Sequence, residues 1–524
     1  MISEFIIQNA PALLIAVPLL GAFLSPLIGR ISRDARALWV LAIITLTTLL
    51  GLLVAYLVYT GGTLIYVFGA AAPALSIPMD SGGIPIRIIL TLDALSALMV
   101  IMTVTVGFSV ILYSLSSDSR RSGLEAYYTL FLLLIASVLG MFTTGDLFNF
   151  FVFLEISSLA AAGLVAYKVE KGKAVEAGLK FLMVSAIGGV FFLLATGILY
   201  GQYNALNIAM LASMIQWTPL DKLALVLIIV ALAAKCGSVP MHYWTPDAYS
   251  MAPAAVTAML VVVSQASLYG LFRFCFTLYG LTLTYAVIGW TLITLGVLSM
   301  VVGVTMAIPQ KDIKRLMAYH SISQTGYMLL GVGVGLAVLG DQALLSSYGF
   351  TAIEGGIFHI FNNALYKGLL FLTAGAVILR IGTSDMNRMG GLGHNMKWTM
   401  ILFIIGALAI AGIPPFNGFA SKFLIYESVF AFNPILSIIA MVVSILTLAS
   451  FVKVFHSVFM GPRLPEYADV KEAPASLLIG MAILSGLVII TGLFPGFFVQ
   501  HLIAPAAHAL ADQSGYLAAV LGGA

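Results

Sequence analysis

The chain repeats one pattern along nearly its whole length: an apolar stretch of about twenty residues, then a short polar loop. Of its 524 residues, 61% are hydrophobic and only 9% are charged. No water-soluble core needs so much apolar surface, so lipid must be the solvent for most of the chain. The pattern therefore predicts an all-α polytopic membrane protein. It has about fourteen transmembrane helices, centred near residues 19, 48, 102, 132, 157, 188, 230, 266, 295, 327, 366, 412, 447 and 487.

The basic residues predict how these helices are oriented. Loops that follow odd-numbered segments hold seventeen of the 24 Lys and Arg residues, whereas even-numbered loops hold only Arg87 and Lys222. Cytoplasmic loops carry an excess of Lys and Arg. We therefore expect a multi-pass protein of the cell (cytoplasmic) membrane with odd-numbered loops in the cytoplasm and both termini outside.

Charged side chains inside the apolar segments are the main functional signal. A charge at the bilayer centre costs about 2.5–3.5 kcal/mol on insertion scales, so such residues usually face a protein interior or a water-filled path. Lys235 precedes Pro240, and Lys422 follows Pro414 and Pro415, so both lysines lie beside helix-breaking prolines. This setting favours a route for protons or small cations. The residues concerned are Lys235, Arg273, Lys367, Lys422, Lys453, Glu155, Glu354 and Glu427.

The two proline-interrupted segments also suggest an internal repeat. Residues 120–280 and 285–462 each hold five predicted helices, and in each the fourth helix is interrupted, so helices 7 and 12 are broken. Matching interruptions in two halves are typical of transporters built from repeats, and an odd number of helices per half makes the repeats inverted. The remaining segments are an N-terminal three-helix segment at 1–115 and a C-terminal helix and tail at 475–524.

Seven sequence motifs carry a family resemblance. Taken in order, they resemble the antiporter-like subunits shared by respiratory complex I, Mrp-type sodium/proton antiporters and energy-converting membrane-bound hydrogenases. Within this family the chain is most similar to the D-type Mrp subunit, the complex I M/N-type chains and their hydrogenase counterpart. The motifs are LTLDALSALM (90–99), NFFVFLEISSLA (149–160), KFLMVSAIGG (180–189), VPMHYWTPDAYSMAPAAVTAML (239–260), KRLMAYHSISQTGYM (314–328), LYKGLLFLTAGAV (365–377) and GIPPFNGFASKF (412–423).

The resemblance implies roles for particular residues. Glu155 matches the fifth-helix glutamate and Lys235 the seventh-helix lysine, whose separation lets the lysine release a proton. Lys422 matches the twelfth-helix residue that faces a second half-channel. His359 and Lys367 fall in the eleventh helix, where the family has a polar relay.

Two positions depart from the family pattern. His320 lies in YHSISQTGY, where relatives often have the histidine three residues later, and Gln324 occupies that neighbourhood. Gln265 stands where many relatives have an eighth-helix lysine, with Ser264 beside it. Neither Gln265 nor Ser264 holds a proton at neutral pH, so a water-mediated or sodium-permissive step is more plausible there.

Other charged residues are predicted to have structural roles. Arg273 and Lys453 lie near helix ends, so we expect their side chains to extend to the membrane interface. Asp93 is expected to cap or anchor its helix. Glu427 could pair with Lys422, five residues earlier, and for Glu354 structural and functional roles are equally plausible.

The leading hypothesis is a proton- or sodium-translocating subunit of a multi-subunit membrane complex. The complex is either an Mrp-type antiporter, with this chain as its D-type subunit, or a hydrogenase or complex I-related redox pump, and the sequence leans weakly toward the second. With two cysteines and no redox or metal motif, the chain itself is expected to carry no cofactor and no redox chemistry. The alternatives are a solitary transporter of a small solute and a non-conducting scaffold subunit; quinone contact stays open.

Overall fold

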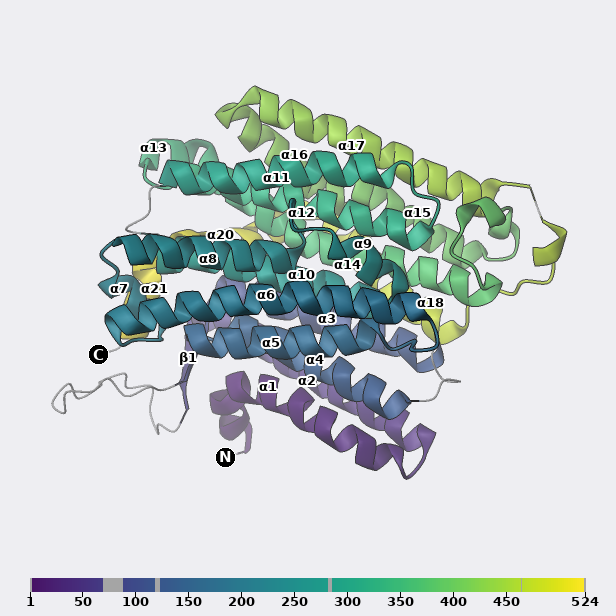
Figure 1. Ribbon diagram of the computed structural model, residues 1–524, viewed down its shortest axis with the longest axis horizontal. Coiled ribbons are helices and arrows are strands. Elements are labelled where there is room, and N and C mark those ends of the chain that lie inside the picture. Colours follow the sequence, from purple (N-terminus) through teal and green to yellow (C-terminus); the bar gives the residue numbers. More distant parts are fainter. Residues whose placement is uncertain (1, 69–87, 118–122, 281–284, 463, 523–524) are drawn as a thin grey trace.

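The computed structural model describes residues 2–68, 88–117, 123–280, 285–462 and 464–522, so Arg87, Arg120, Arg121 and Arg463 lie outside the described ranges. Its helices lie side by side along the long axis of the molecule, with both termini at the same end (Figure 1). The first helices are α1 (Ile2–Gly29), α2 (Arg33–Gly61), α3 (Ala94–Ser117), α4 (Leu124–Thr143), α5 (Leu147–Val165), α6 (Gly172–Tyr203), α7 (Ile208–Met214), α8 (Pro219–Cys236), α9 (Trp244–Met251) and α10 (Ala254–Arg273).

The second part of the chain continues the same bundle. Its longest helix, α14, lies at the centre and packs against α10, α12, α15, α16 and α18. The helices are α11 (Tyr285–Ala307), α12 (Ile313–Ala337), α13 (Gln342–Leu344), α14 (Phe350–Ile381), α15 (Lys397–Ala411), α16 (Asn417–Phe432), α17 (Pro434–Phe455), α18 (Ala475–Leu493), α19 (Pro495–Phe498), α20 (Ala504–Ala511) and α21 (Gln513–Leu521).

This architecture confirms the all-α membrane fold. Each predicted segment contains helix, and within the described residues eleven helices are long and apolar enough to cross a membrane. The other three segments are α8, which carries Asp221, Lys222 and Lys235, the polar helix α12, and the divided segment α15–α16. A count of fourteen crossings therefore stays a prediction.

One element of the fold was not expected from the sequence. Strand β1 (Leu64–Val67) pairs antiparallel with β2 (Ile89–Leu92), so that Leu64 lies opposite Leu92. The run LIYV after Gly62 consists of residues that favour strands, but four residues show too little alternation to predict one. The pair connects the ends of α2 and α3 at the end of the bundle that holds the termini.

The two predicted helix breaks are confirmed. Helix α8 ends at Cys236 and α9 begins at Trp244; helix α15 ends at Ala411 and α16 begins at Asn417. Each first helix ends in a left-handed glycine, Gly237 with φ 75° or Gly412 with φ 76°, a conformation that glycine adopts without steric cost. A break of this kind leaves backbone carbonyls that need donors from elsewhere.

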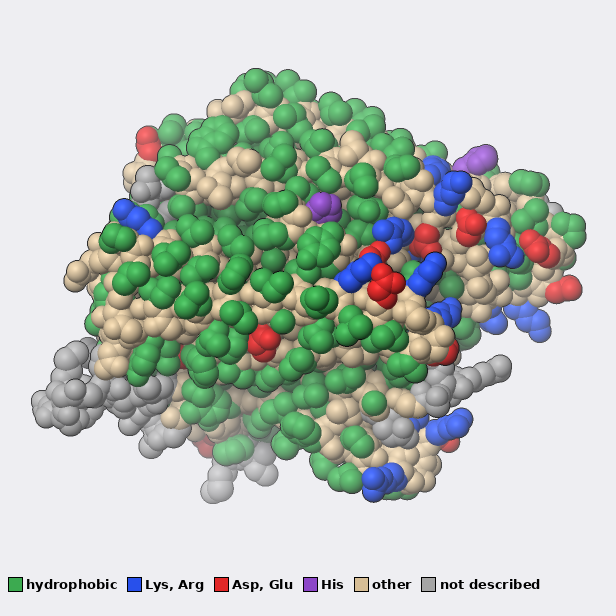
Figure 2. Space-filling model, in the orientation of Figure 1, with side chains coloured by type: hydrophobic (Ala, Val, Ile, Leu, Met, Phe, Trp, Pro, Cys, Tyr) green, Lys and Arg blue, Asp and Glu red, His purple; other side chains and the backbone are tan. Residues whose placement is uncertain are grey.

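Side chains divide the surface into zones. On the face shown in Figure 2, hydrophobic side chains cover most of the flank, and most of the charged ones gather toward one end. We call that end the basic end; Lys173, Glu176, Lys180, Asp247 and Arg315 line a pocket there. The opposite end, which holds both termini together with α7, α13 and α21, is called the terminal end (Figure 1).

Candidate functional site

The first predicted pair of residues is in direct contact. Glu155 lies in the middle of α5, Lys235 lies in the last turn of α8, and the Lys235 Nζ is 2.8 Å from the Glu155 Oε1. Lys235 also donates to the Oγ of Ser158 at 2.7 Å, and Ser158 follows Glu155 by three residues on the same helical face. The lysine side chain is only 4% exposed, whereas that of Glu155 is 29% exposed. The pair is therefore open on one side, toward the flank of α5.

Two consecutive glycines of α6 make room for this pair. A Cβ on Gly189 would lie 2.2 Å from the Glu155 Oε1 and 2.7 Å from its Cδ. A Cβ on Gly188 would lie 3.2 Å from the Ala231 carbonyl oxygen and 3.4 Å from the Lys235 Cε. Gly189 thus lets the carboxylate lie against the α6 backbone.

We predict that Gly189→Ala impairs the pair without unfolding the helix. The added methyl group must displace the Glu155 carboxylate, and misplacing a reacting group by about 1 Å can cost on the order of 100-fold in rate. We expect ion translocation in membrane vesicles to fall by at least about tenfold, which is less than the full figure of about 100-fold. Gly197→Ala on the same helix is the matched control, because nothing lies within 4 Å of the added Cβ. Equal activity of the two variants would contradict the prediction.

The lysine at the second break is also buried. Lys422, in α16, is 1% exposed and donates to the Ile410 carbonyl at 2.8 Å and to the Oγ of Ser444 at 2.9 Å. Its Nζ also lies 4.8 Å from the centre of the Tyr327 ring. The ammonium group thus satisfies a carbonyl that the end of α15 leaves free.

The pairing of Lys422 with Glu427, which the sequence left open, is not formed. Glu427 is exposed, and no ion pair joins it to Lys422 within the described part of the chain. With about 3.6 residues per helical turn, a spacing of five points the two side chains in different directions. Glu354 is half-buried, so its role stays open.

His359 connects α14 to both α12 and α16. Its Nδ1 lies 2.9 Å from the Oγ of Ser421, the residue before Lys422, and its Nε2 lies 3.1 Å from the Oε1 of Gln324. The Tyr366 hydroxyl is 3.3 Å from both the His359 Nε2 and the Gln324 Oε1. The imidazole, which is fully buried, is therefore held at both nitrogens within a polar network.

Lys367 in α14 and His320 in α12 adjoin this network. Lys367 is fully buried, and its Nζ donates to the Met317 carbonyl at 2.5 Å. His320 follows Met317 by three residues and is close enough to Lys367 and Lys422 to interact electrostatically with both. Neither of its ring nitrogens has a hydrogen-bond partner among the described residues.

Gln265 joins the first half of the chain to this network. It is 1% exposed in α10, and its Nε2 donates to the carbonyl of Ile360, the residue after His359, at 3.0 Å. Its Oε1 is buried and accepts no hydrogen bond from the part of the chain that is described. The structure therefore brings His320, His359, Lys367, Lys422 and Gln265 together around α14, while Glu155 and Lys235 form a separate pair.

The expectation that Arg273 extends to the membrane interface is wrong. Arg273 is 3% exposed and makes two hydrogen bonds to Asp93, of 2.6 and 2.7 Å. Asp93 accepts a bond from the Ser96 backbone N–H as well, so the expectation that it anchors its helix is confirmed. Lys453 donates to the carbonyls of Ile308 and Gln310 at 2.9 and 2.8 Å.

Several polar residues of the site were not among the predicted ones. They are Ser158, Gln324, Tyr366, Ser421 and the pair Asn362–Asn417, in which the Asn417 Nδ2 donates to the Asn362 Oδ1 at 3.0 Å. Most lie within a few residues of a predicted charge, which is the signal that could have found them. Within the described ranges, no three His, Cys, Asp or Glu side chains come together in a way that could hold a metal ion.

Comparison with known proteins extends the resemblance noted in the sequence. Residues 144–447 match the family described as NADH:quinone oxidoreductase/Mrp antiporter, TM. The D-type subunit of the Na(+)/H(+) antiporter of Alkalihalophilus pseudofirmus is 32% identical over 447 residues, which cover 83% of this chain and 86% of that protein. The chain spans 54% of the length of the longer A-type subunit from the same organism.

Solved structures agree with this assignment. A chain of the membrane-bound sulfane sulfur reductase, an archaeal respiratory membrane complex, matches with a TM-score of 0.85 and 30% identity, covering 98% of this chain and all of that chain. A chain of the Mrp complex from Dietzia sp. DQ12-45-1b matches with a TM-score of 0.86 and 26% identity, covering 98% and 99%. The protein therefore belongs to the NADH:quinone oxidoreductase/Mrp antiporter transmembrane family.

Proposed function

We propose that this chain translocates protons as one membrane component of a multi-subunit complex. The observation that carries the proposal is the group of buried polar side chains around α14. Gln265 donates to the Ile360 carbonyl, His359 contacts Ser421, and Lys422, the residue after Ser421, lies at a helix break. Lysine and histidine side chains can each take up and release a proton. Burying several of them in a membrane protein is costly and is typical of ion pathways.

Buried polar atoms without partners support a hydrated pathway. Such atoms are rare in proteins and are commonly satisfied by ordered water. Some lie elsewhere in the described part of the chain, and seven of them come from α10, α12, α14 and α16, which pack together around the network. Water between them would connect the fixed side chains into a proton path. The seven atoms in these helices are Gln265 Oε1, both ring nitrogens of His320, Gln324 Nε2, Asn363 Oδ1, Asn417 Oδ1 and the Tyr426 hydroxyl oxygen.

The chemistry of the network favours protons over sodium ions. A sodium ion needs oxygen ligands, whereas the ammonium groups of Lys367 and Lys422 are donors only and repel cations. The Glu155 carboxylate is neutralised by Lys235 at 2.8 Å. Gln265 stands where a lysine was expected and acts by orienting water. The steps that need a charged side chain are then carried out by Lys235 and Lys422.

The proposal includes an orientation and an internal repeat. The basic end would face the cytoplasm, and the terminal end, with both chain termini, would face outside. Residues 120–280 and 285–462 would be inverted five-helix halves, each with a buried lysine beside its helix break. The partly exposed Glu155 in the middle of α5 supports a partner on this flank, because lipid would not solvate a carboxylate.

The kind of complex can be decided by what copurifies with this chain in mild detergent. We expect other membrane subunits in every case, and metal analysis then separates the two versions. Nickel or iron with soluble redox subunits indicates a redox-driven pump, whereas small membrane subunits without metal indicate a gradient-driven antiporter. A chain that purifies alone and transports a solute by itself would contradict the proposal.

A further inference from the structure

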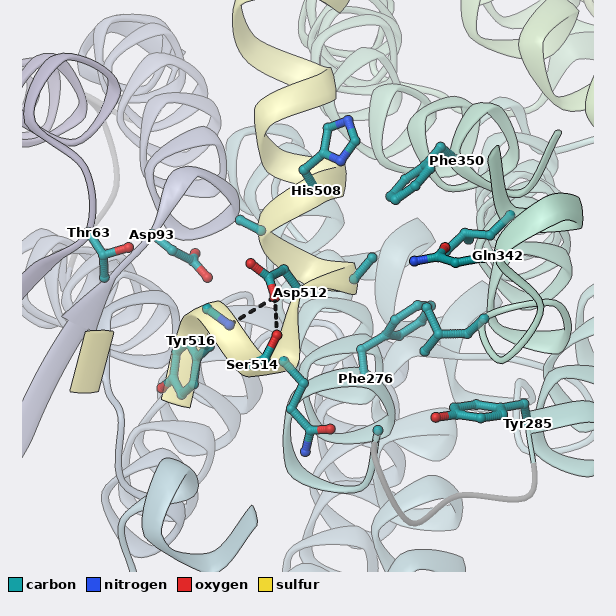
Figure 3. Close-up of a pocket in the computed structure, with 17 residues that line it drawn as sticks. Thr63, Asp93, Phe276, Tyr285, Gln342, Phe350, His508, Asp512, Ser514 and Tyr516 are labelled. Atoms are coloured by element: carbon teal, nitrogen blue, oxygen red, sulfur yellow. Dashed lines mark hydrogen bonds between the residues drawn. The ribbon is translucent and has the colours of Figure 1, made fainter. Parts of the chain in front are cut away.

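A large polar pocket opens at the terminal end of the molecule, away from the network described above. It has a volume of about 630 Å³ and lies between the C-terminal helices and the ends of other helices of the bundle. Asp93, Gln342 and Asp512 line it from different elements, and Asp512 is held by hydrogen bonds of 2.8 Å from the Ser514 hydroxyl and the Gly515 N–H (Figure 3). Helices α20 and α21 form one wall.

A buried ion pair lies at the floor of this pocket. Asp93 lines the pocket although it is only 4% exposed, and Arg273 behind it is 3% exposed. The Asp93 side chain points toward the segment that carries Asp512 and Tyr516 (Figure 3). The Arg273 guanidinium also lies 5.2 Å from the Tyr269 ring and 5.4 Å from the Tyr516 ring. Arg273 thus keeps aromatic neighbours that do not depend on Asp93.

Behind the pair, a polar line follows one face of α10 toward the proposed proton path. Gln265, Tyr269 and Arg273 are spaced by four residues, so their side chains lie on one helical face. The Tyr269 hydroxyl is 2.9 Å from the Ser96 Oγ, and both lie 3.4 Å from the Arg273 Nη2. At the other end of the line, Gln265 has a buried Oε1 that no described residue contacts by a hydrogen bond. The line therefore reaches from the pocket to the residue that joins α10 to α14.

We propose that this pocket is the mouth through which protons pass between the compartment at the terminal end and Gln265, with Asp93 as the proton-accepting group. This inference rests on the proposed function. A hydronium ion in the pocket gives its proton to the Asp93 carboxylate and leaves as water. The acid then gives the proton to a water molecule beside Tyr269, which restores the carboxylate for Arg273. While the ion pair is closed, it separates the pocket from the polar line along α10.

Neutralising both members of the pair tests whether it does more than hold helices together. In Asp93→Asn with Arg273→Gln, neither side chain is a buried unpaired charge, and both keep hydrogen-bonding groups. We expect this variant to assemble into the complex at the normal level and to lose proton translocation. Normal translocation by the assembled variant would overturn the proposal, because the pair would then be structural only.

Thiol labelling tests the pocket without altering the ion pair. In the whole complex with Cys236 and Cys275 replaced by alanine, Ser514→Cys places a thiol on the pocket wall, and Ala518→Cys places one further along α21, outside the pocket. A positively charged, membrane-impermeant methanethiosulfonate reagent, added from the side of the termini, should stop translocation only in Ser514→Cys. Labelling of Ser514→Cys without loss of translocation would overturn the proposed route.

A third variant separates failure of this inference from failure of the proposed function. If Lys235→Ala abolishes translocation but labelled Ser514→Cys remains active, the proton path stands and its mouth lies elsewhere. If both remain active, the chain does not conduct protons along these residues at all.

Discussion

Replacing Lys235 by alanine is expected to abolish proton translocation by the assembled complex. Lys235 is the ammonium group at the first helix break, and its Nζ contacts Glu155 and Ser158 at 2.8 and 2.7 Å. Without it, the Glu155 carboxylate has no counter-charge and the pair cannot open and close. Removing one partner of a buried pair typically costs about 3–5 kcal/mol, so assembly must be measured alongside translocation in inverted vesicles.

Lys222→Ala is the matched control, because Lys222 is an exposed lysine of the same helix, 5.6 Å from the Trp217 ring. We expect it to change stability by no more than about 0.5 kcal/mol. The double variant Lys235→Ala with Glu155→Gln then distinguishes a working pair from a static one. It removes both charges and should assemble better than the single variant without regaining translocation. Translocation by the double variant would mean that the pair only locks α5 to α8.

The helices and the two breaks could be predicted because their signals are local. Apolar length, proline and glycine act over a few residues, so the positions of α8–α9 and α15–α16 follow from the sequence next to them. The strands β1 and β2 were missed because four-residue strands carry almost no periodicity, and their pairing depends on residues far apart in the chain. Lys235 and Lys422 were found because an intramembrane charge has few structural explanations.

The partners of these charges could not be predicted, because they depend on how the helices are rotated and packed. Arg273 lies at a helix end in sequence, which favoured an interfacial position. Its partner Asp93 precedes it by 180 residues and no local pattern connects them. Lys422 and Glu427 show the converse: they are close in sequence, yet Glu427 is exposed and no ion pair joins the two among the described residues. Gln265 was recognised through the resemblance alone, and only the structure connects it to α14.

Replacing Lys422 by arginine tests whether this side chain must release a proton. Arginine keeps the positive charge and can donate to the Ile410 carbonyl and to Ser444, as Lys422 does at 2.8 and 2.9 Å. It stays protonated in proteins, because the pKa of a guanidinium group lies far above neutral pH. We therefore expect Lys422→Arg to assemble and to translocate protons at least about tenfold more slowly, as expected for losing a proton-transferring group. Lys422→Ala should be equally inactive.

Lys453→Arg is the control, because it shows whether a lysine-to-arginine change by itself lowers translocation. Lys453 also binds two backbone carbonyls, yet it is only half-buried and lies outside the network around His359. Arginine at that position should leave translocation unchanged. If Lys422→Arg conducts normally while Lys422→Ala does not, the site needs a fixed positive charge at the second helix break, and the proton must pass through His359 and water instead. If both variants conduct normally, the network at α16 is not part of the path.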